Sequence, residues 1–189
     1  MSKSGVCNRV NFVWGSMSSR LTGIHNEIDP PTLQHPVLAF LKNYWDVQRG
    51  ARKMPTRADI KPADMKEHLG WIILLDVLPD FSDFRYRTIG TRVTQYFLAD
   101  STGKTLSEAF GSYGEAAVNG VLAVHRKAAQ DQVVVRAYGG AGWLGRAFLD
   151  FDSLFLPLSD DGVTANMVLS AFTFDLTQLL QTRAGPSTP

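Results

Sequence analysis

The clearest pattern in the chain is a stripe of apolar residues at helical spacing between residues 36 and 50. The stripe consists of Val37, Phe40, Leu41, Tyr44 and Trp45. Intervals of three and four residues are typical of a helix with one packed face. Pro36 suits the first turn of that helix and Gly50 suits its C-terminal cap. The pattern therefore predicts an amphipathic helix over residues 37–47, near the N-terminal end of the folded region.

Strand patterns follow this helix. Residues 71–79 form an apolar run that ends at Pro79, as expected for a buried strand. Residues 84–89 alternate, which predicts Phe84 and Tyr86 on a packed face, toward helices, and Arg85 and Arg87 on the opposite face. The short polar link between the two strands predicts an antiparallel hairpin.

The second half of the chain changes from helical to strand patterns. Helices are expected from Thr91, from a capping box over Thr105–Glu108, and over residues 113–130. Three further strands are expected over residues 132–138, 147–158 and 163–176. Glycine-rich and Asp-Gly segments separate these strands, and Asp161-Gly162 predicts a tight turn between the last two.

This order of elements predicts an α+β fold. Two hairpins that share one sheet would give five antiparallel strands with helices on one face, preceded by the N-terminal amphipathic helix. Residues 1–32 lack a sustained period and are expected to be a flexible arm. Residues 33–180 should form a single domain, and residues 181–189 a flexible tail.

Composition narrows the function classes. The 189 residues carry a net charge of +1, 44% hydrophobic residues and a single cysteine, which indicates an ordinary globular protein without an intrachain disulfide. The basic residues are dispersed, so we expect no nucleic-acid partner. No apolar run reaches membrane-spanning length and no secretion signal is visible, so we expect a cytoplasmic protein with no membrane association.

Two local motifs each admit a functional and a structural interpretation. Gly140, Gly142 and Gly145 match the G-x-G-x-x-G pattern of nucleotide sites, but a strand pattern follows them where a nucleotide site needs a helix. A hairpin loop is the alternative. Asp150 and Asp152 share a strand face, where they could hold a cation or perform acid–base chemistry, or belong to a solvated strand face.

Nothing in the sequence marks a catalytic or metal site. The four histidines have no metal-ligand spacing, and no nucleophile elbow is present. We therefore expect no catalytic residues, no metal and no enzyme activity, with a small enzyme lacking a recognisable motif as the last alternative. Arg85, Arg87 and Arg92 are expected on a solvated sheet face, or on a docking face for an acidic partner.

Several phrases of the sequence together resemble the bacterial PAS domain family, specifically the PAS family first catalogued as a domain of unknown function. They are "YWDVQRGARKMPTRADIKP", "ILLDVL", "FRYRTIGTRV", "DSTGKTLSE" and "LFLPLSDDG". They occur in the family's order between about residues 38 and 175. The resemblance does not cover the arm before Thr32.

The resemblance implies a sensory or regulatory module that acts through protein–protein interaction, with a signalling protein or a second copy of the chain as partner. It fixes no cofactor. A small ligand in the core is compatible with it, and a haem- or flavin-binding sensor is the alternative. The ligand-pocket candidates are Tyr86, Phe97, Leu122, His125, Phe155 and Met167. The interface candidates are Phe40, Tyr44 and Trp45, whose alternative role is to cap the sheet.

The role of His125 would distinguish a haem-binding sensor from a module without haem. It follows Val118, Val121 and Leu122 at helical spacing and shares their apolar stripe. Haem-binding PAS domains place an iron-ligating histidine on the corresponding helix, so the resemblance implies haem as one ligand of His125. The alternatives are a core histidine that is hydrogen-bonded within the protein and a polar contact to another small ligand.

Overall fold

The structure is a computed structural model, and it describes residues 24–97 and 99–176. The predictions for residues 1–23 and 177–189 lie outside the described residues. The described α-helices are α1 (Pro36–Arg49), α2 (Thr91–Phe97), α3 (Leu106–Phe110) and α4 (Glu115–Asp131). The strands are β1 (His25–Ile28), β2 (Ile72–Val77), β3 (Phe84–Ile89), β4 (Val135–Gly140), β5 (Leu149–Leu158) and β6 (Met167–Leu176). Short 3-10 helices η1–η6 span Arg57–Asp59, Pro62–Met65, Leu69–Trp71, Pro79–Phe81, Gly111–Tyr113 and Ala141–Leu144.

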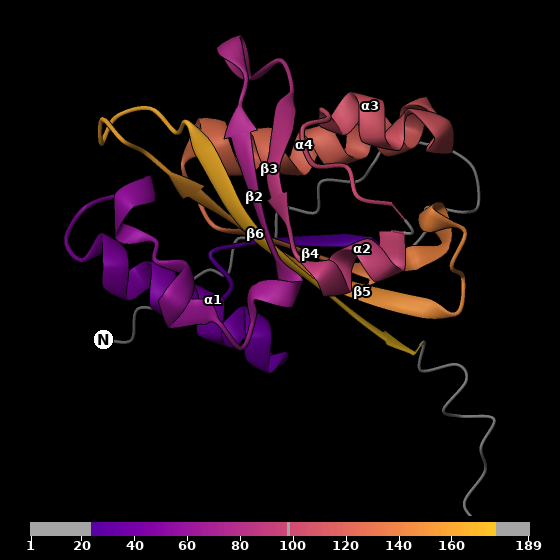
Figure 1. Ribbon diagram of the computed structural model, residues 1–189, viewed down its shortest axis with the longest axis horizontal. Coiled ribbons are helices and arrows are strands. Elements are labelled where there is room, and N and C mark those ends of the chain that lie inside the picture. Colours follow the sequence, from indigo (N-terminus) through magenta and orange to yellow (C-terminus); the bar gives the residue numbers. More distant parts are fainter. Residues whose placement is uncertain (1–23, 98, 177–189) are drawn as a thin grey trace, which may run out of the picture.

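One antiparallel sheet contains all six strands, in the order β1-β4-β5-β6-β2-β3 (Figure 1). The predicted hairpin is confirmed as β2–β3. Phe84 and Tyr86 are buried while Arg85 and Arg87 are exposed, as the alternation predicts. The side chains of β3 alternate in this way because only one of its faces is packed.

The α+β prediction holds, but the number of strands was wrong by one. Residues 25–28, assigned to a flexible arm, form β1 and pair with β4, so that Glu27 lies opposite Arg136. Arg136 Nη1 bonds to Glu27 Oε2 at 3.1 Å. The strand ends at Asp29, which bonds through its backbone and its carboxylate to Val134. A long-range ion pair and these bonds hold a segment that has almost no apolar pattern of its own.

The connection between β5 and β6 also differs from expectation. Asp161-Gly162 does not form a two-residue turn, because the connection runs over residues 159–166. The Asp161 carboxylate instead accepts hydrogen bonds from the backbone of Val163 and Thr164 at 2.8 and 2.7 Å. Gly162 has a φ of 75°, which glycine tolerates better than residues with a side chain.

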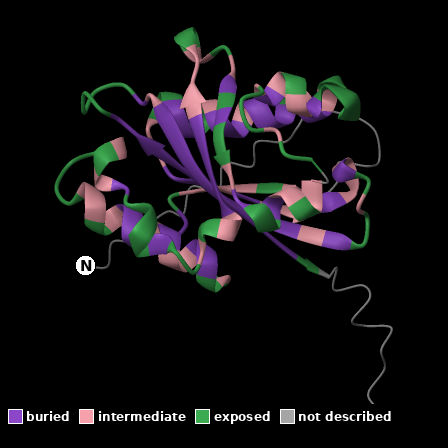
Figure 2. Cartoon of the chain, in the orientation of Figure 1, coloured by how far each residue is buried: buried purple, intermediate pink, exposed green. Residues whose placement is uncertain are grey.

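Helices cover both faces of the sheet (Figure 1). The helices between β3 and β4 all pack on one face of the sheet, as predicted for them. This face carries Phe84, Phe155 and Phe172. The predicted N-terminal helix is α1, which packs against β5 and β6. Leu154 and Leu156, whose side chains point away from α4, are fully buried there. The strands between the two helical layers are buried over most of their length (Figure 2).

Candidate functional site: an apolar cavity beneath α4

A cavity of about 40 Å³ lies between α4 and the sheet. Its helix side consists of Ala117, Gly120, Val121 and Val124. Its strand side consists of Ala137, Phe151, Ser153, Phe155 and Phe172. Ile24 and Trp143 complete the lining. Ser153 and Trp143 are the only lining residues with polar side-chain atoms, and no charged residue lines the cavity, so the cavity suits uncharged ligands.

Small residues on α4 create the space. Ala117, Gly120, Val121 and Val124 recur at intervals that place them on one face of the helix. A glycine inside a helix costs about 1 kcal/mol relative to alanine. Gly120 therefore weakens the helix locally, and in return it leaves room that a larger side chain would fill.

The floor of the cavity is a layer of aromatic rings from β5 and β6. Phe155 and Phe172 meet edge to face with centroids 5.6 Å apart, and Phe151 stacks on Phe172 at 6.4 Å. Between them, Ser153 donates a hydrogen bond of 2.7 Å to the Ala137 carbonyl. Since every second residue of β5 faces α4, the odd-numbered positions supply the floor.

Trp143 and Ile24 come from segments outside the helix and the central strands. Trp143 lies in η6, and its ring is 5.7 Å from Phe110 and 5.8 Å from Phe151. Ile24 immediately precedes β1. Neither residue was predicted to belong to a pocket, because one lies in a glycine-rich loop and the other in a segment expected to be flexible.

His125 is a core residue beside the cavity. Its ring lies 5.2 Å from Phe84 and 4.7 Å from Phe155, and only 2% of the residue is exposed. Nδ1 donates to the Val121 carbonyl at 2.7 Å. Burial lowers the pKa of His125 from 6.5 to about 4, against the opposing effects of this hydrogen bond and of Asp83. The imidazole is therefore neutral at pH 7.

The described residues do not fit haem or flavin. The bond from Nδ1 leaves Nε2 of His125 as the nitrogen that could face a metal. The ring is nevertheless enclosed by Phe84 and Phe155, and His125 does not border the cavity. Small-molecule sites usually measure roughly 300–1,000 Å³, whereas this cavity measures about 40 Å³. The hydrogen-bonded core histidine is the alternative that the geometry favours.

The structure brings only part of the predicted ligand pocket together. Of the six candidates, only Phe155 lines the cavity. His125 packs against Phe155 without bordering the cavity, and Tyr86 and Leu122 are buried outside its lining. Phe97 packs against the rings of α3 and β6. Met167 pairs with Leu158 and lies on the sheet face directed away from α4, so it cannot reach this cavity.

Two of the three interface candidates are core residues. Trp45 is 4% exposed, and its Nε1 donates to the Pro157 carbonyl at 2.9 Å. Tyr44 is 8% exposed, and its hydroxyl accepts a hydrogen bond of 2.9 Å from the backbone of Lys61. Phe40 is partly buried and lies against Tyr44 and His68. The stripe thus caps the sheet, which is the alternative role considered above.

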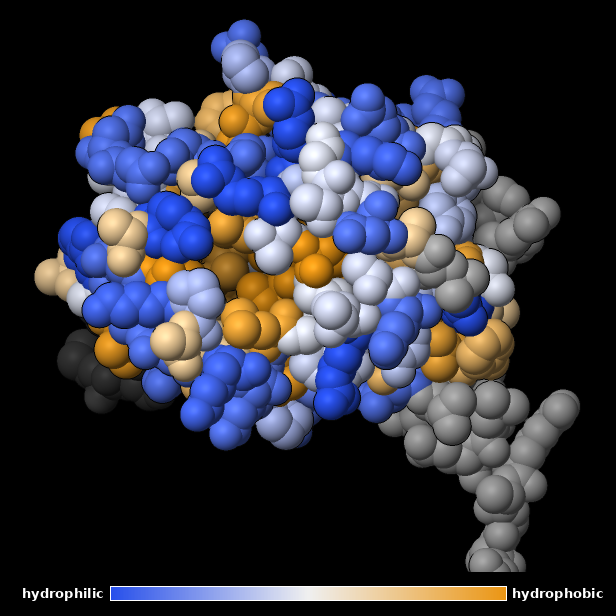
Figure 3. All heavy atoms as spheres, in the orientation of Figure 1, coloured by the Kyte–Doolittle hydropathy of each residue, from blue (hydrophilic) through white to orange (hydrophobic). Residues whose placement is uncertain are grey.

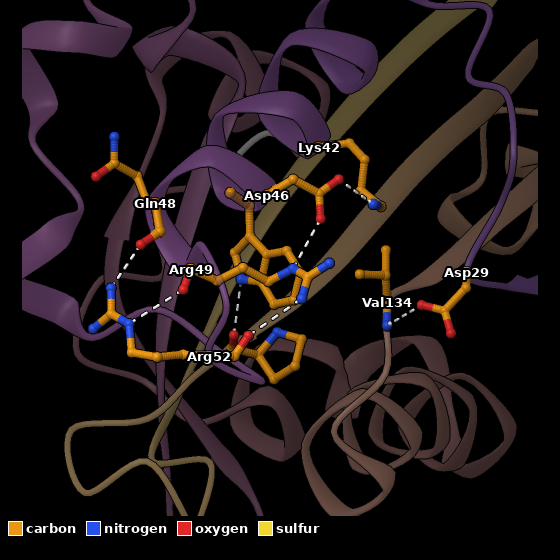
Figure 4. Close-up of polar contacts among 9 residues, drawn as sticks. Asp29, Lys42, Asp46, Gln48, Arg49, Arg52 and Val134 are labelled. Carbon is orange, nitrogen blue, oxygen red and sulfur yellow. Dashed lines mark hydrogen bonds and ion pairs between the residues drawn. The ribbon is translucent and has the colours of Figure 1, made fainter.

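Charged residues surround Trp45 on the outer side of α1. Lys42 and Arg49 both bond to Asp46 (Figure 4). Both cations also lie over the Trp45 ring, at 5.9 and 5.3 Å from its centroid. Arg52 bonds to the backbone carbonyls of Gln48 and Arg49. These contacts fasten the C-terminal end of α1.

One member of the acidic pair of β5, Asp152, has a structural role. Arg136 binds Asp152 through two hydrogen bonds, of 2.9 and 2.8 Å. Over residues 24–97 and 99–176, no group of three or more acidic, histidine or cysteine side chains is placed to hold a metal ion. In the basic group predicted from Arg85, Arg87 and Arg92, Arg87 pairs with Asp76 and Arg92 lies over the Trp71 ring.

The glycine pattern belongs to a hairpin. Gly140 ends β4, η6 follows, and Gly145 precedes β5. The glycine pattern is followed by strand β5, so the helix N-terminus that a phosphate would need is missing from this segment. The hairpin interpretation of the G-x-G-x-x-G pattern is therefore confirmed.

Comparison with known proteins identifies the family. The family model described as "PAS domain" matches residues 33–173, about three quarters of the chain. No curated protein and no solved structure matches the chain. Within the described residues, no helix has both the length and the apolar character needed to cross a bilayer. Because the match spans most of the chain and agrees with the sheet and helices, the chain belongs to the PAS domain family of sensory and regulatory modules.

Proposed function

We propose that this protein is a cytoplasmic sensory module that binds a small apolar molecule in the cavity beneath α4 and reports its presence to a signalling protein. The observation that carries the proposal is the cavity itself, whose walls include both α4 and the residue next to β1. Binding, and not catalysis, is the activity proposed.

The lining explains how occupancy could be transmitted. Ile24 lines the cavity and directly precedes β1, a strand of four residues that pairs with β4. A ligand that pushes Ile24 outward would strain this short strand. Short edge strands with few bonds open more readily than central strands. Changes in the cavity therefore have a direct route to the surface at β1.

A second candidate partner surface lies on the face shown in Figure 3. Figure 3 shows apolar residues in a hollow near the centre of the visible face, with hydrophilic residues around it. Apolar areas with a polar rim are typical of protein interaction sites. The signal would reach a partner through this face or through β1, and the partner is proposed to be a signalling protein.

The experiment uses xenon as the probe, because it is an apolar atom small enough for a cavity of about 40 Å³. Nuclear magnetic resonance would follow the methyl groups of Val121 and Val124, and amide hydrogen exchange would follow β1. The variant Ala117→Leu places a larger side chain at the cavity wall, while Asn119→Leu adds the same side chain at an exposed position of α4. Asn119→Leu is the matched control.

The expected result is specific to the cavity. The probe should shift the valine methyl signals and change the exchange of the β1 amides in the wild type and in Asn119→Leu, and do neither in Ala117→Leu. A probe that leaves the valine methyl groups unchanged in the wild type would contradict ligand binding. Shifts of equal size in Ala117→Leu would place the binding site elsewhere.

A second measurement tests whether occupancy of the cavity changes the binding of a partner protein. Proteins captured from lysate by the wild type and by Asn119→Leu should include one whose yield changes when the probe is added, and this change should be lost in Ala117→Leu. A captured set that is the same with and without the probe would contradict signalling through the cavity.

A further inference from the structure

Two aromatic rings and one cation lie together where η3 meets α2. The rings of Trp71 and Tyr96 stack with their centroids 5.9 Å apart, and the Arg92 guanidinium lies 5.3 Å from the centroid of the Trp71 ring. Arg92 is exposed, and the two aromatic side chains are only partly buried. We refer to these three residues as the η3–α2 patch. The patch lies on α2, which belongs to the face that Figure 3 shows (Figure 1).

Close backbone packing fixes the position of the η3–α2 patch. A Cβ at Gly90 would lie 2.3 Å from the Gly70 carbonyl oxygen, so η3 and the start of α2 are in direct contact. The Gly90 N–H donates to the Ile72 carbonyl at 2.8 Å. The Arg92 side chain covers Gly70, where an added Cβ would meet its Cγ at 2.9 Å. The patch is therefore preformed, and a partner that binds it would lose little affinity to ordering of this surface.

Arg92 has no carboxylate partner of its own. Within residues 24–97 and 99–176 it forms no ion pair and no side-chain hydrogen bond, whereas Arg87 pairs with Asp76. A guanidinium can stack on an aromatic ring and still bind a carboxylate through its N–H groups. Trp, Tyr and Arg are also the residues most enriched at the positions that dominate binding energy in protein interfaces. The patch thus has the composition of an interface anchor and an unpaired positive charge.

A continuous series of aromatic contacts joins the floor of the cavity to this patch. Phe172, which lines the cavity, meets Phe97 edge to face at 5.7 Å. Phe97 lies 6.0 Å from Phe174, and Phe174 stacks on Tyr96 at 4.3 Å. Tyr96 in turn stacks on Trp71. Because packed rings leave little free space between them, a displacement of Phe172 would be passed through α2 to the patch.

We propose that the η3–α2 patch is the docking surface for the partner protein, and that the partner presents an acidic segment in which an apolar side chain lies beside a carboxylate. The apolar side chain packs on Trp71 and Tyr96, and the carboxylate binds Arg92. This inference rests on the proposed function, since it names the surface and the partner chemistry through which the cavity reports. A nucleic acid is disfavoured, because the net charge is only +1 and the basic residues are dispersed.

A phage-displayed library of random linear peptides is the probe, and it is selected on the full chain. The most enriched peptide is then synthesised and titrated into the wild type and into Arg92→Gln. Glutamine has the same side-chain carbons as arginine as far as Cδ, so this variant keeps the cover over Gly70 and removes the charge.

Lys53→Gln is the matched control, because it removes an exposed cation at a distant position. The neighbouring Pro55 accepts a hydrogen bond from Ser159, directly after the end of β5 that pairs with Met167. The patch lies near Phe174, at the opposite end of the β5–β6 hairpin. A loss of affinity caused only by the lower net charge would appear equally in both variants.

We expect the selected peptides to be enriched in aspartate or glutamate next to an apolar residue. The dissociation constant of the synthesised peptide should rise about tenfold in Arg92→Gln, as expected for the loss of a hydrogen bond to a charged group, and stay unchanged in Lys53→Gln. The indole N–H resonance of Trp71, identified by its absence in Trp71→Phe, should shift when the peptide is added to the wild type. This readout does not depend on the folding of Arg92→Gln.

The inference is overturned if no peptide is enriched, if the enriched peptides lack acidic residues, or if the peptide leaves the Trp71 resonance unchanged. Equal affinity in Arg92→Gln and the wild type would also overturn it. In each of these cases, a response of the Val121 and Val124 methyl groups to xenon would show that the cavity still binds a ligand. Peptide binding at Trp71 together with no response of these methyl groups to xenon would support the docking surface and contradict the proposed function.

Discussion

Replacing His125 by phenylalanine should remove a large part of the pH dependence of stability between pH 7.5 and pH 5. Phenylalanine is of similar size and keeps the aromatic packing against Phe84 and Phe155. It has no group that can titrate. The difference between wild type and variant therefore isolates the contribution of the imidazole from that of all other groups.

The sign of the effect follows from proton binding. Burial lowers the pKa of His125 from 6.5 to about 4 in the folded protein. Between these two values the unfolded chain binds a proton that the folded protein does not, so stability rises with pH in this range. The contribution is fully present above pH 6.5 and is lost as the pH falls toward 4.

The magnitude is large enough to measure. Two and a half pKa units correspond to roughly 3.5 kcal/mol at most, since each unit is worth about 1.4 kcal/mol. At pH 5 the unfolded chain is almost fully protonated at this histidine and the folded protein is not, so roughly 2 kcal/mol should already be lost.

Urea denaturation at pH 7.5 and pH 5 is the assay. The free energy of unfolding of the wild type should fall between these pH values by roughly 2 kcal/mol more than that of His125→Phe. Equal losses in the two proteins would refute the reasoning, because they would show that the imidazole titrates in the folded protein much as it does in the unfolded chain.

Three further substitutions test the packing. Gly90→Ala should destabilise the fold by about 2 kcal/mol or more, because its Cβ would lie 2.3 Å from the Gly70 carbonyl oxygen; the control Gly111→Ala meets no atom within 4 Å and should change the urea midpoint little. Trp45→Phe should cost about 1–3 kcal/mol in thermal unfolding, because it leaves a buried β5 carbonyl without its donor; an unchanged melting temperature would contradict this. Arg136→Lys should accelerate amide exchange in β1, because lysine cannot make the two-bond contact to β5 that braces the ion pair with β1; unchanged exchange there would show that backbone pairing alone holds the strand.

The strands that the sequence predicted are those whose burial has a local pattern. Residues 84–89 alternate between apolar and basic side chains, and β3 has this alternation in the structure. β1 was missed because "HNEI" offers one large apolar residue in four. Its position depends on Glu27 meeting Arg136, which is more than a hundred residues away in the chain. A pairing between residues so far apart in the chain produces no pattern in the local sequence.

The same limit applied to Met167. Alternation along β6 shows that its residues fall into two sets, but the pattern does not say which set faces α4. That choice depends on the partner strands, which put Met167 opposite Leu158, on the face covered by α1. Phe155 does lie on the face that packs against α4, although alternation along β5 does not show which face that is.

The cavity itself was misplaced on α4 for a different reason. The apolar stripe of this helix predicted Leu122 and His125 as pocket residues, and both lie in the core. A stripe of large side chains fills space, however, and a cavity can remain only where side chains are small. The lining of α4 accordingly includes Ala117 and Gly120. A glycine within a long helix, where it lowers stability, is therefore a better indicator of the cavity in this chain than the most hydrophobic positions of the helix.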